Sequence, residues 1–578
     1  EALGENAQVL VDLMPELENI IGPRPAAPAL SGTAAQNRLN RLFQKFIQVF
    51  TTPSHPLVIF LDDLQWADSA SLNLMQVLLA DAQAGYLLLL GTYRDNEVFP
   101  AHPLMLTLDE LDQGDTTVHT LILEPLNNQK LNRLVADTLH SPPHVAQPLT
   151  VLVMQKTQGN PFFASQFLRV LHQDRLITFD QETGYWQCDI AQVSAAALTD
   201  DVVELMAAQL QKLPPDTQEI LKLAACMGAQ FDLNTLAIVA KHSREDTARF
   251  LWIALEQGLV LPISQVYKFF QISESLATET TANPRYRFLH DRVQQAAYEL
   301  IPHQEKPSFH YLIGQQLLAQ IQSAENSPLL FEVTSHLNLG AALLDTAKQR
   351  EELANLNLLA GNQARQSAAY ETAANYFSQG LLLLTDAHWS SHYALMLALT
   401  ENAAEASHLS GRLADMNGFI ATVCDRATHL LDKIKVHEIQ IQSNMAQGNL
   451  VDAISLGLDI LTQLEITLPA TPTPGDVETA IGNTLAHLNG RDPRDLVHLP
   501  AMTDPHKLAA LRILKRVAPC AYQAAPMLLP LLVTEQVNLS MAYGNAPLSA
   551  SSYGFWGLIL CGVVGNIPLG YKFGQLAL

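Results

Sequence analysis

The sequence is poor in basic residues, in cysteine and in long apolar runs. Its 578 residues include 34 Lys and Arg against 57 Asp and Glu, which gives a formal net charge of −23. This balance argues against broad nucleic-acid binding and against binding an anionic membrane, because both need basic side chains. The five cysteines are scattered and form no CxxC pair. We therefore expect reduced thiols in helices and a cytoplasmic location.

Three further absences narrow the class of protein to which this chain can belong. The most membrane-like run, residues 555–564, is too short to span a bilayer, which takes about 20 apolar residues, so we expect a buried repeat helix there. No signal peptide is visible in the first residues, which include acidic side chains. The phosphate-cradling pattern G-x-x-x-x-G-K-[ST] occurs nowhere. The chain opens on Glu1 and closes on apolar residues 576–578, which suggests a segment of a longer polypeptide.

The feature around which the chain is organised is an apolar run at residues 57–61 that ends in Asp62 and Asp63. The run predicts a strand buried on both faces of a parallel sheet. Ligands of such sheets bind beyond the carboxyl ends of the strands. There Asp62 could hold Mg²⁺ directly or through a water, and Asp63 could orient the water that attacks a γ-phosphate. The alternative is a solvated loop after an ordinary strand.

The segment that follows favours a nucleotide-binding site over a solvated loop. Asp68 or Ser69 is an N-cap for a helix with apolar residues at helical spacing. A second buried strand follows at residues 86–90, and it is closed by residues 91–95, which include Arg94. The order of strand, acidic pair, helix, strand and arginine is that of the Walker B to sensor half of a nucleotide-binding α/β domain.

Three sequence boxes support a family resemblance: DDLQWAD at 62–68, GTYRD at 91–95 and GNPFF at 159–163. With them the chain resembles the AAA-like ATPase module of the signal-transduction ATPases with numerous domains (STAND). More narrowly, it is similar to the central segment of large bacterial multidomain kinases. These join a serine/threonine kinase, this ATPase, helical repeats and a sensor histidine kinase. The resemblance runs from about residue 31 to the C-terminus and is loose in the repeats.

The resemblance implies roles for three further residues. Arg94 would sense the γ-phosphate or a neighbouring motif, Pro161 would pack near the adenine, and His290 would contact a phosphate. Each of these residues also has a purely structural explanation. Arg94 could be a surface residue paired with Asp95, Pro161 could belong to a common turn, and His290 could cap a helix. We expect the aromatic side chains after Pro161 to be core residues (Phe162, Phe163 and Phe167).

The resemblance also implies ATP and Mg²⁺ as cofactors. In the family the P-loop lies upstream of the part that matches residues 1–50, so we expect this chain alone to bind ATP weakly or not at all. In the family, glutamate is commoner than aspartate at the position of Asp63. We therefore expect ATP hydrolysis to be slow or absent. ATPase, serine/threonine kinase and histidine kinase activities are implied for the whole protein, and this segment lacks the kinase domains.

Between the boxes, a third strand is expected at 118–123, helices at 128–139 and 148–158, and a hairpin from 176 to 188. The order of elements expected in residues 200–300 is that of a winged-helix domain. Helices are expected near 202–213, 217–227, 233–240 and 245–257. Wing strands are expected at 259–263 and 286–289, with a polar loop between them. The recognition helix would carry only Lys241, so DNA is not expected as a partner.

From residue 303 onward the sequence reads as almost all helix. Residues 369–377, 411–416 and 448–456 share a pattern with a period of about 40, as in tetratricopeptide-like helix pairs. Residues 469–474 read as a loop between repeat blocks. Such arrays form a concave surface for a partner.

The expected architecture is therefore an α/β P-loop NTPase-like core without its Walker A segment, then a winged-helix domain and an all-α repeat array. The domains would be 1–30 (linker), 31–199 (ATPase core and lid), 200–302 (arm) and 303–578 (repeats). ATP–Mg²⁺ would switch the arm, a protein partner or ligand would bind the repeats, and kinase domains would act in cis. An oligomer on activation fits this scheme. The rivals are a helical scaffold with a dead nucleotide site and a transcription regulator.

Overall fold

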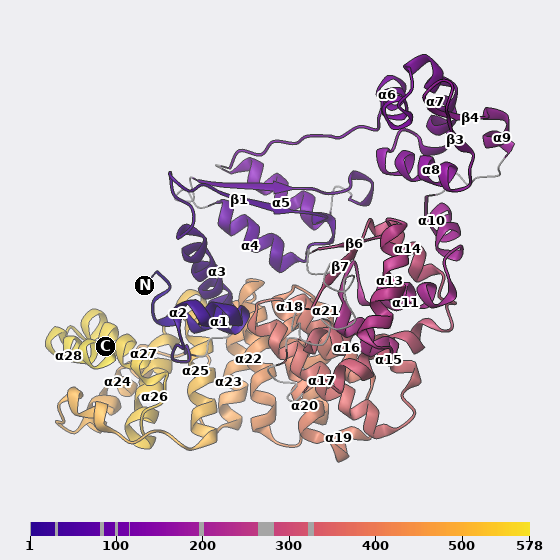
Figure 1. Ribbon diagram of the computed structural model, residues 1–578. Coiled ribbons are helices and arrows are strands. Elements are labelled where there is room, and N and C mark those ends of the chain that lie inside the picture. Colours follow the sequence, from indigo (N-terminus) through magenta and orange to yellow (C-terminus); the bar gives the residue numbers. More distant parts are fainter. Residues whose placement is uncertain are drawn as a thin grey trace. The chain divides into compact units, whose positions relative to one another are not determined.

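The computed structural model describes residues 2–28, 33–80, 86–98, 102–114, 116–195, 202–263, 283–321, 327 and 329–578. The chain forms two compact units (Figure 1). Unit 1 joins residues 1–117 to residues 354–578, and unit 2 holds residues 118–353. The expected loop at 264–283 lies almost entirely outside the described residues. The four-domain division stays a prediction.

Unit 1 begins with short helices that the sequence analysis did not predict. They are η1 (Gly4–Asn6), α1 (Gln8–Leu13), η2 (Pro15–Leu17) and α2 (Glu18–Ile21), and the longer α3 (Thr33–Gln48) follows. Leu10 of α1 and Leu39 and Leu42 of α3 share a hydrophobic cluster with Tyr370, the first residue of a repeat helix. This cluster joins the amino-terminal helices to the repeats within unit 1.

The strand pair at the centre of the expected ATPase core is present. Strand β1 (Leu57–Leu61) runs parallel to β2 (Leu87–Gly91), with Leu61 opposite Gly91. The connection between the strands contains η3 (Leu64–Trp66) and α4 (Ser69–Leu79), and η4 (Asp95–Glu97) and α5 (Pro103–Gln113) follow β2. Asp68 caps α4, since its carboxylate accepts from the Ser71 N–H at 2.7 Å. The predicted N-cap is confirmed.

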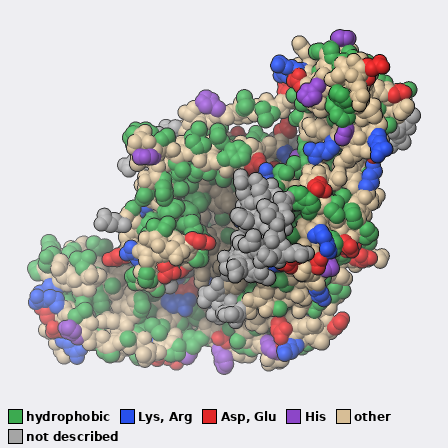
Figure 2. Space-filling view, viewed as in Figure 1, with side chains coloured by type: hydrophobic (Ala, Val, Ile, Leu, Met, Phe, Trp, Pro, Cys, Tyr) green, Lys and Arg blue, Asp and Glu red, His purple; other side chains and the backbone are tan. Residues whose placement is uncertain are grey.

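The prediction that β1 is buried on both faces is wrong. Val58 and Phe60 are 55% and 60% exposed, and their partners Leu88 and Leu90 are 52% and 47% exposed. Side chains alternate between the faces of a strand, so these four share one face, and the half-buried alternate residues share the other. Each strand has one hydrogen-bonded neighbour in the described part of the chain. Hydrophobic side chains reach the surface in this part of unit 1 (Figure 2).

Unit 2 begins without the third strand that residues 118–123 predicted. The segment is irregular, and Leu121, Ile122 and Leu123 are 84%, 77% and 85% exposed. A β-rich run becomes a strand only where a neighbour pairs with it, and the described residues offer none. Helix α6 (Asn128–Leu139) has the predicted bounds, and α7 (Pro143–Thr157) starts earlier than predicted and contains Pro148.

The next part of unit 2 contains a further helix and confirms the predicted hairpin. Helix α8 (Pro161–Gln173) follows the GNP turn, and β3 (Ile177–Asp180) pairs antiparallel with β4 (Tyr185–Cys188). Cys188 therefore lies in a strand, whereas the other four free cysteines lie in helical segments. The short α9 (Ile190–Ala195) follows.

Helices and a small sheet alternate between residues 202 and 299. The helices are α10 (Val202–Gln211), α11 (Pro215–Met227), α12 (Leu233–Ala240), α13 (Arg244–Glu256) and α14 (Asp291–Glu299). The strands are β5 (Gln230–Asp232), β6 (Val260–Pro262) and β7 (Arg285–Phe288), in the order β5-β7-β6 and antiparallel. The two predicted strands are present, and β5 was not predicted.

From residue 303 the described chain is helical, as predicted. Unit 2 holds α15 (Lys306–Leu318), α16 (Leu330–Leu339) and η7 (Ala341–Leu343). The long α17 (Ala347–Gln366) continues into unit 1, and the array goes on with α18 (Tyr370–Leu382), α19 (His388–Ser391), α20 (Tyr393–Leu409), α21 (Leu413–Arg426), α22 (Leu430–Ala446) and α23 (Leu450–Gln463).

The three predicted repeat motifs fall at equivalent turns between paired helices. Ala368, Gly411 and Gly448 all have positive φ, at 59°, 78° and 79°. The next residue in each case has φ near −80° and ψ near 60°, and a helix starts directly after it. The turns recur at about 40 residues, which is the spacing of paired-helix repeats. The internal repeat inferred from sequence is therefore a structural repeat.

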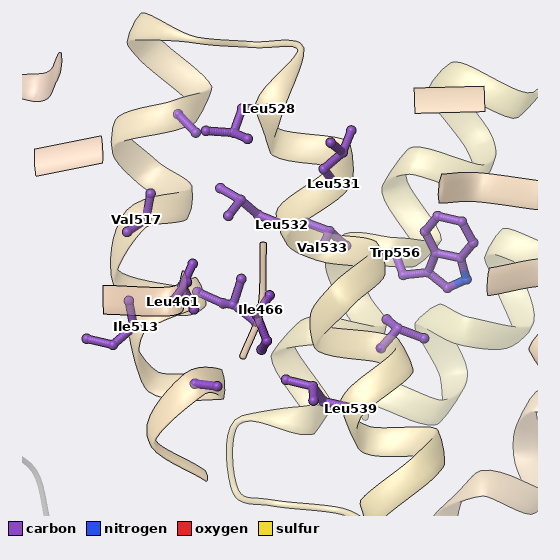
Figure 3. Packing of buried hydrophobic residues seen from close by; sticks show 14 of the residues in the cluster. Leu461, Ile466, Ile513, Val517, Leu528, Leu531, Leu532, Val533, Leu539 and Trp556 are labelled. Atoms are coloured by element: carbon purple, nitrogen blue, oxygen red, sulfur yellow. The ribbon is translucent and has the colours of Figure 1, made fainter. Parts of the chain in front are cut away.

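The last helices of unit 1 bury an extended hydrophobic core (Figure 3). They are α24 (Pro474–Leu488), η8 (Pro493–His498), α25 (Pro505–Ala524), α26 (Leu528–Tyr543), α27 (Ser549–Ile559), the π-helical turn η9 (Leu560–Val564) and α28 (Ile567–Ala577). Thr473 and Asp476 cap α24 reciprocally. The run at 555–564 is helical, but only partly buried: Trp556 is 1% and Leu558 is 67% exposed. In the described residues no helix combines the length and apolarity needed to cross a membrane.

Candidate functional site

The carboxyl edge of the β1–β2 pair brings Asp62 and Thr92 together. The register sets Leu61 opposite Gly91, so the next residue of each strand leaves the sheet at the same edge. The Thr92 hydroxyl donates to Asp62 Oδ1 and accepts from the Asp63 N–H at 3.2 Å. Asp62 is exposed. A carboxylate and a hydroxyl beside each other form the oxygen donor set that Mg²⁺ prefers.

Asp63 turns the chain away from the strand. Its φ of 57° and ψ of 46° are left-handed, a conformation that aspartate tolerates better than most residues. Its Oδ1 accepts from Gln65 Nε2 at 2.9 Å and lies 3.6 Å from Arg94 Nε. The Asp63 carboxylate is therefore held in place, while Asp62 faces solvent.

Arg94 contacts the acidic pair from the second strand. Its Nη1 lies 3.0 Å from Glu97 Oε1, and its guanidinium is 5.3 Å from the centre of the Trp66 ring. The side chain is 26% exposed. The structure thus brings together three predicted residues, Asp62, Asp63 and Arg94, in one constellation. The alternative reading paired Arg94 with Asp95, and the structure shows ion pairs of Arg94 with Asp63 and Glu97.

The predicted residues of unit 2 form a second constellation. Asn160 caps α8, because its Oδ1 accepts from the Phe163 N–H at 2.9 Å, and Pro161 occupies the first helical position. The Phe162 ring stacks on the His290 ring at 4.2 Å between centroids and 22° between planes. The GNP turn and His290, far apart in sequence, therefore meet through Phe162. We had placed Phe162 in the core, but it is half-buried against His290, whereas Phe163 and Phe167 are core residues as predicted.

His290 also caps a helix, as its plain alternative proposed. Its Nδ1 accepts from the Arg292 N–H at 3.2 Å at the start of α14, and it contacts Asp291. Further along α8, Arg169 Nη1 donates to the Gln257 carbonyl at 3.1 Å at the end of α13. Helix α8 is thus tied to α13 and α14 at two points.

Four residues of these sites were not predicted: Thr92, Gln65, Glu97 and Phe162. Thr92 and Gln65 lie inside the GTYRD and DDLQWAD boxes, so a polar residue in a box was the available signal. Phe162 directly follows the proline of the third box. Glu97 had no signal, since its contact depends on how the chain turns after β2.

Comparison with known proteins places these sites in a family context. The model of the AAA ATPase domain matches residues 1–90. The chain is 25% identical to hybrid signal transduction histidine kinase G of Dictyostelium discoideum, over all of this chain and 20% of that protein. It is 24% identical to the peroxide stress-activated histidine kinase mak2 of Schizosaccharomyces pombe, over 39% of this chain and 9% of that protein.

A solved structure is also similar. It is a STAND protein with a tetratricopeptide repeat sensor from Pyrococcus horikoshii, with 12% identity, a TM-score of 0.36, and coverage of 93% of this chain and 82% of that one. The chain spans about a fifth or less of the two kinases that it matches. The sequence matches confirm the resemblance to an AAA-type ATPase module and to multidomain signalling kinases.

Proposed function

We propose that this chain is the nucleotide-dependent switch and sensor segment of a multidomain signal-transduction kinase. The observation that carries the proposal is the parallel β1–β2 pair, whose carboxyl edge gathers Asp62, Asp63, Thr92 and Arg94. In parallel α/β sheets this edge is where ligands bind. The AAA ATPase match to residues 1–90 covers both acids.

The donor set fits Mg²⁺–ATP on the metal side. Asp62, with Thr92 beside it, would hold the cation directly or through water. Bound Mg²⁺–ATP supplies a γ-phosphate polarised for attack by water. Asp63 would orient that water, because Gln65 and Arg94 already fix its carboxylate. Arg94 would sense the phosphate, and its ion pair with Asp63 would link it to the attacking water.

The phosphate cradle must come from elsewhere, since no G-x-x-x-x-G-K-[ST] segment occurs in the chain. We place it upstream of Glu1 in a longer polypeptide. The exposed face of β1 and β2, with Val58, Phe60, Leu88 and Leu90, is consistent with this placement, because parallel sheets are normally covered on both faces.

Unit 2 would supply the moving part. We assign residues 200–302 to a winged-helix arm and residues 31–199 to the core and lid, after the linker at 1–30. The antiparallel β5-β7-β6 sheet among helices supports the arm. The Phe162–His290 stack and the Arg169–Gln257 bond support an arm docked on lid helix α8. Pro161 would pack near the adenine and His290 near a phosphate.

The repeats at 303–578 would then act as the sensor. Binding of a protein partner or ligand there would shift the arm, and a difference in ATP affinity between arm positions would drive the switch. Kinase domains elsewhere in the polypeptide would give the output, and an oligomer on activation would fit this scheme. Neither nucleic acid nor a membrane is a proposed partner.

The test uses the polypeptide extended upstream to include the phosphate-binding segment. Asp62→Asn should weaken Mg²⁺–ATP binding at least tenfold by calorimetry, because a cation ligand is lost. Asp63→Asn should leave affinity within twofold and slow any hydrolysis at least tenfold. Asp95→Asn, a neighbouring exposed acid, serves as the control and should change neither. Equal and mild effects of the first two substitutions would show that the site is wrongly placed.

The second candidate is a helical scaffold with a degenerate nucleotide site. The exposed sheet face and the missing phosphate-binding pattern favour it. Under this candidate the extended protein binds no ATP with or without Mg²⁺, and all three variants behave alike. ATP binding that depends on Asp62 excludes the scaffold.

A further inference from the structure

A pocket of about 330 Å³ lies between α24 and α26, within unit 1. Its floor is built from side chains of the core that the last helices of unit 1 bury: Leu488, Leu496 and Leu539 are 7%, 1% and 5% exposed. Leu539 is among the residues drawn in Figure 3. Met541 and Tyr543 add to the wall. We call this the α24–α26 pocket. Its volume is at the low end of the range for ligand pockets, about 300–1,000 Å³, so its ligand would be small.

The pocket carries charges of both signs over this apolar floor. Glu535 of α26 and Arg491, just after α24, both line it. Glu535 is half-buried, while Arg491 is exposed at the rim. Neither forms an ion pair within 4 Å in the part of the chain that the structure describes. A carboxylate that is partly removed from water without an ion-pair partner favours a cation, and an arginine at the rim favours a carboxylate.

The other polar groups near Glu535 have partners of their own. His487 Nδ1 lies 3.3 Å from Asn538 Oδ1. Lys507 Nζ lies 3.6 Å from Glu465 Oε2 and 5.6 Å from the centre of the Tyr543 ring. Burial raises the pKa of Glu535, an effect that Lys507, Asn538 and His487 oppose. The Glu535 carboxylate thus has a hydrogen bond from Asn538 but, among the described residues, no ion pair within 4 Å, and the guanidinium at the rim has none either.

We propose that the α24–α26 pocket binds a small aliphatic α-amino acid, with Glu535 receiving its ammonium group and Arg491 its carboxylate. The aliphatic side chain would lie against Leu488, Leu496 and Leu539. A simple anion such as phosphate fits poorly, because Glu535 would repel it. A simple amine leaves Arg491 without a partner. The inference is independent of the nucleotide site, because all of its residues lie in the repeats.

The test is calorimetry on the 578-residue chain with three probes of the same carbon skeleton. They are L-leucine, 3-methylbutylamine, which lacks the carboxylate, and 4-methylpentanoate, which lacks the ammonium group. Leucine should bind at least tenfold more tightly than either analogue. Glu535→Gln should weaken leucine and the amine at least tenfold and should not weaken the acid. Arg491→Gln should weaken leucine and the acid and should spare the amine.

Glu478→Gln is the matched control, since Glu478 is an exposed carboxylate on α24, one of the two helices beside the pocket, and does not line it; it should change no affinity. Far-UV circular dichroism checks each fold, and Glu535→Asp, which withdraws the carboxylate by one methylene, replaces Glu535→Gln if that variant unfolds. Absence of leucine binding at 10 mM, equal binding of the three probes, or unchanged leucine affinity in the Glu535 variant would each overturn the proposal.

Discussion

Acidification should destabilise unit 2 through a buried pair of histidines. His310 of α15 and His336 of α16 are 5% and 6% exposed, and their Nδ1 atoms lie 2.9 Å apart. The Tyr298 hydroxyl at the end of α14 lies 3.1 Å from His310 Nε2. A hydrogen bond between the two Nδ1 atoms needs one hydrogen between them, so one ring donates and the other accepts. Protonation of the accepting Nδ1 would set two N–H groups against each other, so the contact requires the accepting ring to be neutral.

The surroundings of the two histidines also favour their neutral forms, because they lower the pKa of both rings. Burial, with the neighbouring His310, lowers the pKa of His336 to about 4. Burial and the Lys306 ammonium lower the pKa of His310. That ammonium lies 4.0 Å from the centre of the Tyr298 ring. In the unfolded chain a histidine has a pKa of about 6.5. Between these values the unfolded state binds more protons, so stability is full above pH 6.5 and is lost as pH falls toward 4.

The magnitude follows from linkage. For His336 alone, a pKa of about 4 in the fold against about 6.5 unfolded removes about 2 kcal/mol between pH 7.5 and pH 5. Buried carboxylates titrate in the same window with the opposite sign, because burial raises the pKa of Glu401 to about 6. The experiment must therefore compare variants rather than read the wild-type curve alone.

The assay is urea denaturation at pH 7.5 and pH 5, followed by far-UV circular dichroism, for the wild type and two variants. His336→Gln keeps an acceptor for the His310 N–H but cannot titrate, so its loss of stability on acidification should be about 2 kcal/mol smaller than that of the wild type. His303→Gln, an exposed histidine of the same unit, should behave as the wild type. If His336→Gln and the wild type lose the same free energy, the histidine pair is not the group that titrates.

Two further predictions concern a close approach of the backbone at Gly159 and the ion pair between Arg512 and Glu438. Gly159→Ala should destabilise unit 2 by more than about 2 kcal/mol, because φ is 79° and a Cβ would lie 2.3 Å from the Leu126 carbonyl oxygen. Gly184→Ala, where φ is 78° in open space, should cost only about 1 kcal/mol, and equal losses in thermal melts would contradict the steric argument. Arg512→Met should cost about 2 kcal/mol, since it leaves the Glu438 carboxylate, 9% exposed, without its bidentate partner. Adding Glu438→Gln should recover part of that loss, and a double variant no more stable than Arg512→Met would refute this account.

The sequence specified the helices well wherever caps and periodicity agreed. Helices α6 and α12 have the predicted bounds, and Asn127 and Asp232 cap them. The sequence predicts that a helix begins at Pro148. In the structure, helix α7 begins at Pro143 and continues through Pro148. A proline inside a helix costs about 3 kcal/mol, and only the packing of the rest of the helix can offset it. Local sequence does not contain that information.

Strands depend on partners, and this dependence accounts for the largest errors. The apolar run of β1 predicted a strand correctly, yet it said nothing about how many neighbours the strand has. The similar run at 118–123 has no partner among the described residues and stays irregular. Hydrophobic composition measures what a segment could bury, whereas pairing and coverage come from other parts of the polypeptide.

The candidate site shows the same division. The sequence predicted Asp62, Asp63 and Arg94 as site residues, because acids after an apolar run and an arginine after the next strand are local patterns. It could not predict the Arg94–Asp63 contact, since that contact depends on the register that sets Leu61 opposite Gly91. Within the proposed function the contact separates the two acids, because an ion-paired Asp63 would orient a water, whereas exposed Asp62 would bind the cation. The proposed division of roles between two adjacent acids therefore depends on the pairing of two strands.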